Sequence, residues 1–191
     1  MMLLLACLNS PDLMAGTGAS VGEPAPVFTG KDLDANEVSL TTEGTVVLEW
    51  FNPGCPFVKY AHEKGGPLDD MAQRWASEGV GWLAINSGSP GGQGTGAKTN
   101  RQAAKRWKMD HPILLDESGT IGKLYGASST PQIAVIHDGT LVYWGGLDNA
   151  PRGMAPDGVA INFTENALED IKAGRPVKVT TSKSYGCSVK Y

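Results

Sequence analysis

The stretch that decides the fold reads Thr45-Val-Val-Leu-Glu-Trp-Phe-Asn-Pro-Gly-Cys-Pro-Phe-Val-Lys-Tyr60. Its apolar first half predicts a buried strand over 45–51, and Asn52-Pro-Gly-Cys55 predicts a turn. The residues that follow predict a helix that begins beside Cys55. Free backbone N–H groups and the positive end of the helix dipole favour a thiolate at such a position, and the thiolate is the form that attacks disulfides and peroxides. Cys55 is therefore the predicted nucleophile.

Strand and helix patterns alternate through the rest of the chain. The helix from Pro56 is expected to run to about Ser77 with a break at Gly65-Gly-Pro67, before a strand over 79–85. A strand, a helix and a second strand in this order predict a parallel pair. The further predicted elements are a helix over 98–107, a strand over 112–115, a short helix over 121–125, a hairpin of strands over 133–136 and 140–144, and a helix over 163–173. This order predicts an α/β fold, with a mixed central sheet flanked by helices on both faces.

Length and composition indicate one folded domain. The chain has 191 residues, of which 41% are hydrophobic, so it can bury one sizeable core. A net charge of −4 leaves no basic surface of the kind that binds nucleic acid. We expect a signal-like remnant and flexible tether over 1–20, the folded domain over 21–175, and a C-terminal tail over 176–191 that carries Cys187.

The N-terminus resembles the end of a secretory signal. Met1-Met-Leu-Leu-Leu-Ala-Cys7 contains a lipobox-like Leu4-Leu-Ala-Cys7, although the basic region and the long apolar core of a complete signal are missing. If Cys7 carries lipid, the protein lies outside the cytoplasm on a membrane. Its location would then be periplasmic or lipid-anchored. The alternative is an apolar N-terminus without a targeting role, in which case a cytoplasmic location is open.

Cysteine and histidine usage favours a thiol site over a metal site. Cys7, Cys55 and Cys187 are too few for a disulfide framework and have no zinc-ligand spacing. The histidines lie in separate segments without a partner at ligand spacing, so we interpret each as a surface or loop residue; they are His62, His111 and His137. No metal and no organic cofactor is predicted.

A glycine-rich loop over 87–96 precedes the helix at 98–107. The segment Gly91-Gly-Gln-Gly-Thr-Gly-Ala-Lys98-Thr99 nearly matches a phosphate-binding loop, but Ala97 separates Gly96 from Lys98. Lysine and hydroxyl would then miss the phosphates and the metal. We interpret the loop as a mobile insertion that borders the active site.

Three features are expected to converge on Cys55. Thr130-Pro131 stands at a strand entry, where a cis peptide bond can direct backbone polar groups toward a neighbouring loop. Glu49 lies in the apolar strand; if buried it would have a raised pKa and could exchange the thiol proton, whereas strand alternation could instead turn it to solvent. Cys187 could resolve a sulfenate or a mixed disulfide formed at Cys55, or it could be a small buried apolar residue.

Several segments resemble, in the same order, those of the redoxin branch (AhpC/TSA-type, peroxiredoxin-like) of the thioredoxin superfamily. They are residues 46–59, Trp82-Leu-Ala-Ile-Asn-Ser87, Leu115-Asp-Glu-Ser-Gly-Thr-Ile-Gly122, Tyr125-Gly-Ala, Thr130-Pro131 and Gly186-Cys-Ser-Val-Lys-Tyr191. The resemblance implies a thioredoxin-like three-layer sandwich with Cys55 as the reactive thiol and Pro131 as a cis-proline facing it. It also implies dithiol/disulfide or peroxide chemistry.

The chain departs from two family patterns. Thioredoxins carry Cys-x-x-Cys, whereas Val58 stands where the second cysteine would be. Peroxiredoxins carry Pro-x-x-x-Thr-x-x-Cys and an activating arginine, whereas Leu48 and Asn52 occupy the first two positions here. Peroxide reduction should therefore be slow unless Asn52 or one of two distant arginines substitutes; these are Arg101 and Arg152.

The sequence predicts a thiol-dependent oxidoreductase that acts on protein disulfides or small hydroperoxides and is restored by an external thiol reductant. Cys55 attacks, Cys187 is the candidate resolving thiol, and Glu49 is a possible proton acceptor. The residues expected to line the substrate cleft are Asn52, Pro53, Gly54, Pro56 and Thr130. A peroxiredoxin-type antioxidant peroxidase and a redox-inert thioredoxin-fold binding module are the alternatives.

Overall fold

The computed structural model describes residues 18–191. The predictions for the signal-like segment, and for lipidation of Cys7, lie outside the described residues. Among residues 18–191, the structure contains no helix that combines the length and the apolar character needed to cross a bilayer.

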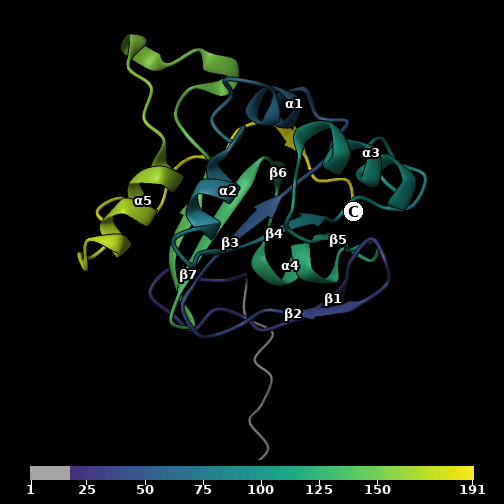
Figure 1. Ribbon diagram of the computed structural model, residues 1–191, viewed down its shortest axis with the longest axis horizontal. Coiled ribbons are helices and arrows are strands. Elements are labelled where there is room, and N and C mark those ends of the chain that lie inside the picture. The colour runs from purple at the N-terminus through teal and green to yellow at the C-terminus, as the bar shows by residue number, and fades with distance from the viewer. Residues whose placement is uncertain (1–17) are drawn as a thin grey trace, which may run out of the picture.

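The chain folds around a five-stranded mixed sheet in the order β5-β4-β3-β7-β8 (Figure 1). The β3 strand pairs in parallel with β4 and antiparallel with β7, and β7 forms an antiparallel hairpin with β8. The strands are β1 (Thr29–Lys31), β2 (Glu37–Ser39), β3 (Thr45–Trp50), β4 (Gly81–Asn86), β5 (Ile113–Leu115), β6 (Ser129–Thr130), β7 (Gln132–His137), β8 (Thr140–Gly145) and β9 (Cys187–Ser188). The helices are α1 (Pro56–His62), α2 (Met71–Ala76), α3 (Ala97–Trp107), α4 (Thr120–Tyr125) and α5 (Phe163–Lys172), with 3-10 turns η1 (Pro151–Gly153) and η2 (Pro156–Gly158).

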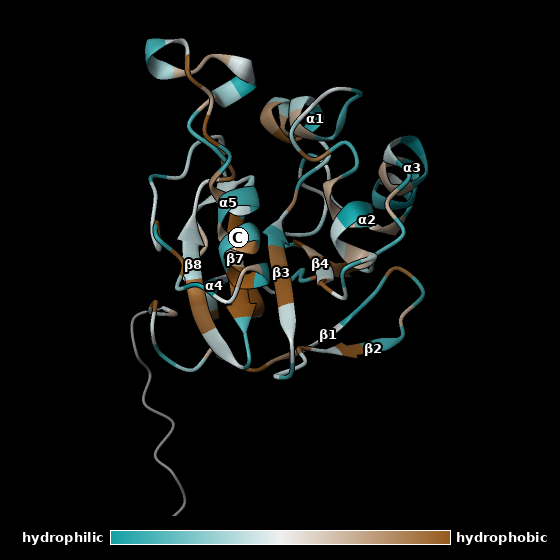
Figure 2. Ribbon diagram, turned by 60° about the vertical axis from the view of Figure 1, so that its left-hand side comes forward, coloured by the Kyte–Doolittle hydropathy of each residue, from teal (hydrophilic) through white to brown (hydrophobic). Residues whose placement is uncertain are grey.

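Helices cover both faces of this sheet, which confirms the predicted three-layer thioredoxin-like architecture. One face packs against α1, α2, α3 and α5, and the other against α4 and the N-terminal segment. Hydrophobic residues run through the middle strands β3 and β7 (Figure 2). Since β3 lies between β4 and β7 and is covered on both faces, its residues 46–50 are all buried.

The predicted break in the first helical segment is confirmed. Between α1 and α2 the chain passes through Gly65 with a φ of 81°, which glycine adopts without a steric penalty, and then through Pro67. The break lets α1 and α2 pack separately on the sheet. As a result, α1 directs its N-terminus toward the end of β3 that leads into Cys55.

Two regions of the fold were not anticipated from the sequence pattern. The N-terminal segment forms a small antiparallel pair of strands, β1 and β2, that leads into the core face lined by α4. At the other end, β9 pairs with β6, so the last residues lie beside the loop that precedes β7. Whether residues 176–191 act as a unit separate from residues 21–175 stays a prediction.

Several contacts hold the C-terminal segment against the domain. The backbone N–H of Val189 donates to Ser128 O at 3.0 Å, and that of Ser89 donates to Lys190 O at 2.7 Å. The Tyr191 hydroxyl donates to Ala127 O at 2.6 Å. These bonds place Cys187 at a defined position beside β6.

Candidate active site

Cys55 begins helix α1 and is buried. It is the N-cap residue of α1, and its side chain is only 1% exposed. Its Sγ–H donates to the carbonyl oxygen of Thr130 at 3.2 Å. Phe51, Val58 and Trp107 pack around it in one apolar cluster. The thiol thus lies at the junction of the β3–α1 turn and the segment that enters β7.

The Thr130–Pro131 peptide bond is cis, as expected from the sequence. Thr130 is 4% exposed, and its carbonyl points at the Cys55 sulfur. Thr130 also belongs to β6, where it pairs with Cys187. Thr130 therefore contacts both Cys55 and Cys187, although the two cysteines are far apart in the sequence.

Cys187 lies next to Cys55 and changes its ionisation. Burial raises the pKa of the Cys55 thiol, but contacts to the Cys187 thiol, the Thr130 side chain and the backbone N–H groups of Val58 and Cys187 outweigh burial and lower it. Burial and the neighbouring Cys55 raise the pKa of Cys187 to about 11. Both thiols are free, and Cys55 is the one that ionises first.

The glycine-rich loop borders the site, as predicted. The Asn52 side chain accepts a hydrogen bond from Gly54 N at 2.8 Å and donates one to Gln93 O at 2.9 Å. A side chain at Gly94 would collide with Asn52, so the loop approaches the Cys55 turn at a distance that only glycine allows. Asn52 therefore fixes the turn and the loop together.

The other predicted cleft residues differ in exposure around the thiol. Pro53 is buried, Gly54 is half-buried, and Pro56 is exposed at the first position of α1. The Thr130 hydroxyl donates to Cys187 O at 3.4 Å. Their roles in substrate binding stay predictions.

Glu49 is fully buried and does not turn to solvent. His62 Nε2–H donates to Glu49 Oε1 at 2.7 Å, and Trp82 Nε1–H donates to Glu49 Oε2 at 3.3 Å. Burial alone raises the pKa of this carboxyl, but His62 and the hydrogen bonds outweigh it, so the pKa is lowered. The raised pKa expected from burial is therefore wrong, because the carboxylate has partners that stabilise its charged form.

His62 was interpreted as a surface residue, and this is wrong. Its side chain is buried at the C-terminal end of α1, where it pairs with Glu49. Its ring stacks on Trp107 with centroids 5.2 Å apart and meets the edge of Phe51 at 5.6 Å. The signal in the sequence was helical spacing, since His62 shares the inward face of α1 with Val58.

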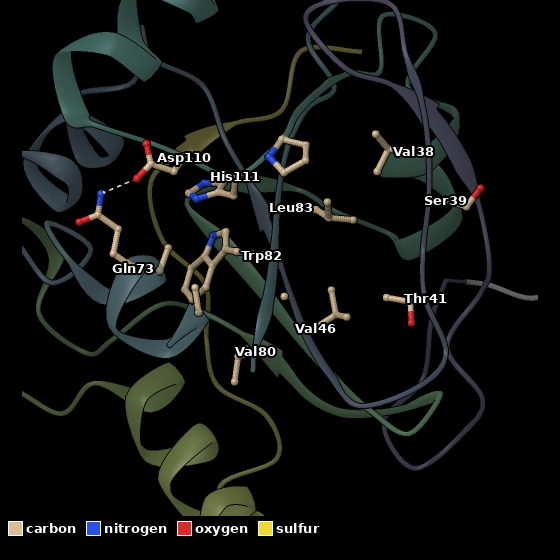
Figure 3. A pocket seen from close by; sticks show the side chains of 14 residues that line it. Val38, Ser39, Thr41, Val46, Gln73, Val80, Trp82, Leu83, Asp110 and His111 are labelled. Carbon is tan, nitrogen blue, oxygen red and sulfur yellow. Dashed lines mark hydrogen bonds between the residues drawn. The ribbon is translucent and has the colours of Figure 1, made fainter. Parts of the chain in front are cut away.

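His111 lies behind this pair, at the edge of an apolar cleft of about 410 Å³ (Figure 3). The cleft is lined by residues of β2, α2, β4 and the segment before β5, and neither Cys55 nor Cys187 lines it. His111 Nε2 is buried without a hydrogen-bond partner, and burial lowers the pKa of His111 to about 4. His137, by contrast, is half-buried and bonds Thr45, as a residue near a hairpin turn can.

Metal-ligating side chains do not gather in the part of the chain that the structure describes. No group of three or more His, Cys, Asp or Glu residues there could hold a metal ion. The chemistry that the described site offers directly is that of two adjacent thiols.

A cysteine at the start of a helix, facing the residue before a cis-proline in a mixed sheet, defines the class as thioredoxin-like. Within this class, residues 21–144 match the model of the AhpC/TSA family. This stretch is more than half of the chain, and the chain belongs to that family. Family membership supports a thiol-dependent redox enzyme in general. No protein with a curated description matches the chain.

Solved structures share this fold. An uncharacterized conserved protein from Geobacillus kaustophilus is 27% identical, with a TM-score of 0.77 over 90% of this chain and 92% of that one. A hypothetical protein from Sinorhizobium meliloti is 26% identical, with a TM-score of 0.79 over 91% and 96%. The peroxidoxin BcpB from Mycobacterium tuberculosis, at 17% identity and a TM-score of 0.50 over 82% and 93%, shares the fold.

Proposed function

We propose that the protein is a thiol-disulfide oxidoreductase in which Cys55 attacks a substrate disulfide and Cys187 resolves the product. The observation that carries the proposal is the placement of two free thiols at Thr130: Cys55, the N-cap of α1, donates to Thr130 O at 3.2 Å, and Cys187 pairs with Thr130 from β9. Cys55 has a lowered pKa, and Cys187 has one raised to about 11 by burial and by Cys55 itself. One thiol is prepared to attack while the other stays protonated.

In the first step the Cys55 thiolate attacks one sulfur of the substrate disulfide. A mixed disulfide forms at Cys55, the substrate S–S bond breaks, and the other substrate sulfur leaves as a thiolate that takes a proton from solvent. The negative charge on Cys55 is then gone. Because that neighbouring sulfur contributes to the raised pKa of Cys187, Cys187 becomes easier to deprotonate at this stage.

In the second step the Cys187 thiolate attacks the Cys55 sulfur. The Cys55–Cys187 disulfide forms and the second substrate sulfur leaves, so two electrons have passed from the protein to the substrate. An external dithiol returns the protein to its reduced state by the same exchange in reverse. Cys187 therefore attacks after Cys55, because it is deprotonated more easily once the negative charge on the Cys55 sulfur is gone.

Glu49 was predicted as a possible proton acceptor. Its carboxylate is bound by His62 and Trp82, and its lowered pKa makes it a poor acceptor for a thiol proton. The proposed cycle therefore transfers no proton through Glu49. Its contacts support a role in positioning His62 and Trp82 instead.

Peroxide reduction is the second candidate, supported by the family to which the chain belongs. In that reaction the Cys55 thiolate would attack one oxygen of a hydroperoxide, so that the O–O bond breaks, Cys55 becomes a sulfenic acid, and the other oxygen leaves as an alcohol or water after taking a proton. The Cys187 thiol would then attack the sulfenic sulfur, forming the disulfide and releasing water. The arginine that could stabilise the breaking O–O bond is missing from the contacts of Cys55 in the described residues. Arg101 is engaged by Asp34 at 2.7 Å, and Arg152 lies on the exposed η1 turn. Disulfide exchange is therefore preferred.

One pair of assays tests the proposal. Reduced wild-type protein and Cys55→Ser are compared for reduction of insulin disulfides and for consumption of hydrogen peroxide, with Cys187→Ser as the matched control. We expect Cys55→Ser to abolish insulin reduction, while Cys187→Ser accumulates mixed disulfides. Equal insulin reduction by wild type and Cys55→Ser would refute the proposal, and rapid peroxide consumption lost only in Cys55→Ser would favour the peroxidase.

The compartment in which the protein works is also part of the proposal, because it depends on the N-terminal segment. A periplasmic or lipid-anchored location depends on Cys7, outside the described residues. Metabolic labelling with a radioactive fatty acid, comparing wild type with Cys7→Ser, would test whether that cysteine is lipidated.

A further inference from the structure

Tyr185 holds the chain on the N-terminal side of Cys187. Its hydroxyl donates to Asp148 Oδ1 at 2.6 Å, and its ring lies 5.9 Å from that of Phe57 on α1. This part of the chain, yellow in Figure 1, runs past α1. Phe57 stands two residues after Cys55. Since Tyr185 stands two residues before Cys187, its contacts join the segment that carries one thiol to the helix that begins at the other.

Asp148 is a fixed acceptor for the Tyr185 hydroxyl. Asp148 is buried, and its Oδ1 also accepts from the backbone N–H of Ala150 at 2.8 Å. The backbone of Asp148 forms an antiparallel bridge to Asn162, the N-cap residue of α5. Burial and the Asp148 carboxylate raise the pKa of Tyr185, so the hydroxyl stays protonated and continues to donate at the pH values where Cys55 ionises.

Gly186 lets the chain pass from Tyr185 to Cys187 close to Thr130. Its φ is 115°, and an added side-chain carbon would collide with the Thr130 carbonyl oxygen. That oxygen is the one that accepts from the Cys55 sulfur. Because a single residue separates Tyr185 from Cys187, a fixed Tyr185 limits how far the Cys187 thiol can move from Cys55.

The contacts on the two sides of Cys187 go to different parts of the fold. Cys55 is 1% exposed and Cys187 contacts its thiol, so a substrate sulfur reaches Cys55 only when neighbouring residues move. On the C-terminal side, β9 is two residues long and pairs with β6. A β9 strand released from β6 would still be tethered by Tyr185 to Asp148. Such a tether keeps a second thiol at a high effective concentration.

We infer that Tyr185 is the positioning residue for the second step of the cycle, and that its hydrogen bond to Asp148 holds Cys187 within reach of the Cys55 sulfur. This inference rests on the proposed function, and it names the contact that brings the resolving thiol into place. If Tyr185 only stabilised the fold, its loss would lower the free energy of unfolding and leave the thiol equilibrium unchanged.

The Cys55–Cys187 disulfide provides the readout. In a glutathione buffer the two protein thiols form the disulfide with loss of two electrons and two protons, and one oxidised glutathione becomes two reduced ones. Mass spectrometry after acid quenching and alkylation measures the disulfide in wild type, Tyr185→Phe, Asp148→Asn and Tyr125→Phe. Tyr125→Phe is the matched control, because that buried hydroxyl donates to Pro26 O at 2.7 Å on the opposite face of the sheet.

Tyr185→Phe keeps the ring and loses the hydroxyl. We expect an equilibrium constant for the disulfide about tenfold lower than in wild type, which makes the reduction potential about 30 mV less negative. Release of glutathione from a mixed disulfide at Cys55 should slow about tenfold. Asp148→Asn retains an oxygen that can accept the hydrogen bond, so it should lose less than Tyr185→Phe. Tyr125→Phe should match the wild type.

An unchanged disulfide equilibrium in Tyr185→Phe would overturn the inference, and so would an equal fall in Tyr125→Phe. A wild type that forms no Cys55–Cys187 disulfide would also overturn it. Urea denaturation of both variants should show similar losses of stability, so that only the thiol equilibrium distinguishes them. A failure of the proposed function appears in a different assay, as insulin reduction that survives Cys55→Ser.

Discussion

The two ends of helix α1 have different surroundings. At its N-terminal end Cys55 meets Cys187 and the Thr130 carbonyl, and contacts around the sulfur lower its pKa. At its C-terminal end His62 is buried against Glu49 and stacked on Trp107. The first end offers a group that can react, and the second a polar pair enclosed by the core.

This difference separates chemistry from stability within one short helix. Changes at the Cys55 end should alter thiol reactivity with little cost in folding, since a free thiol there forms no ion pair. Changes at the His62 end should cost folding free energy and leave Cys55 reactivity nearly unchanged, because a buried charge that loses its partner is expensive.

The largest effect is expected for His62→Ala. It leaves the Glu49 carboxylate buried without the hydrogen bond from His62, which should lower the free energy of unfolding by about 3–5 kcal/mol. Urea denaturation at pH 7 measures this. His137→Ala is the matched control, because that histidine is half-buried and its loss should cost under about 1 kcal/mol.

A second variant shows whether the unpaired charge causes the loss. In the double variant Glu49→Gln/His62→Ala the buried charge is gone, so part of the lost stability should return. A clear shift in the pH dependence of Cys55 alkylation in His62→Ala, with little loss of unfolding free energy, would contradict the proposed separation between the two ends of α1.

The next effect concerns acid stability through His111. Burial lowers its pKa in the folded protein to about 4, against 6.5 for the free side chain. Below pH 6.5 the unfolded chain takes up this proton and the folded one does not, so stability falls as the pH drops from 6.5 to about 4. The contribution lost across this window is about 3 kcal/mol.

His111→Gln removes this dependence, and urea denaturation at several pH values between 4 and 7 measures it. The wild type should lose stability more steeply than the variant across the window. Glu49 has a lowered pKa, so the stability that it contributes is lost only below pH 4.5, the ordinary pKa of a glutamate side chain. Identical pH profiles for wild type and variant would show that His111 is not buried as the structure has it.

Gly94→Ala probes the loop that closes over the Cys55 turn. Gly94 and Gly91 have similar positive φ angles of 77° and 79°, but a side chain at Gly94 would collide with Asn52 and one at Gly91 would meet nothing within 4 Å. Both alanines carry the cost of a left-handed backbone, of about 1 kcal/mol. Gly94→Ala should cost about 1–3 kcal/mol more than Gly91→Ala.

The same pair of variants should differ in reactivity. Displacement of the loop by Gly94→Ala exposes Cys55 to solvent and should speed its alkylation by iodoacetamide, whereas Gly91→Ala should leave the rate as in wild type. Equal rates in the two variants would mean that the loop does not limit access to the thiol.

The smallest change in stability is expected for Cys187→Ala, which should also shift the ionisation of Cys55. Removing the Cys187 thiol takes away a contact that lowers the pKa of Cys55, so this pKa should rise. In the reciprocal variant Cys55→Ala, the pKa of Cys187 should fall from about 11. Alkylation rates followed against pH measure both, and an unmoved Cys55 profile in Cys187→Ala would show that the two thiols do not interact.

Local patterns predicted the sheet and most helices. The run of apolar residues in β3, the turn before Cys55 and the break between α1 and α2 are set by neighbours in sequence, which is where periodicity and turn chemistry are informative. The short strands β1 and β2 have too few residues for a period to show. The pairing of β9 with β6 joins distant segments, which no local pattern reports.

The site was predictable to a similar extent. Cys55 and the cis bond before Pro131 followed from sequence, but the neighbours that set the ionisation of Glu49 did not. The alternation of side chains along a strand left open that Glu49 faces solvent. In the structure both faces of β3 are covered, so a side chain on either face is buried. His62 was misjudged because a single histidine gives no periodic signal, although its spacing from Val58 was helical.

The close approach of Gly94 to Asn52 has a practical consequence for anyone who wishes to attach a reporter to this protein. A stretch so rich in glycine looks like a spacer into which a fluorophore or an epitope could be placed. A side chain at Gly91 meets nothing within 4 Å, whereas an insertion near Gly94 would push the loop away from Asn52 and from the turn before Cys55. A probe attached at Gly91 would therefore label this loop without disturbing its contact with Asn52.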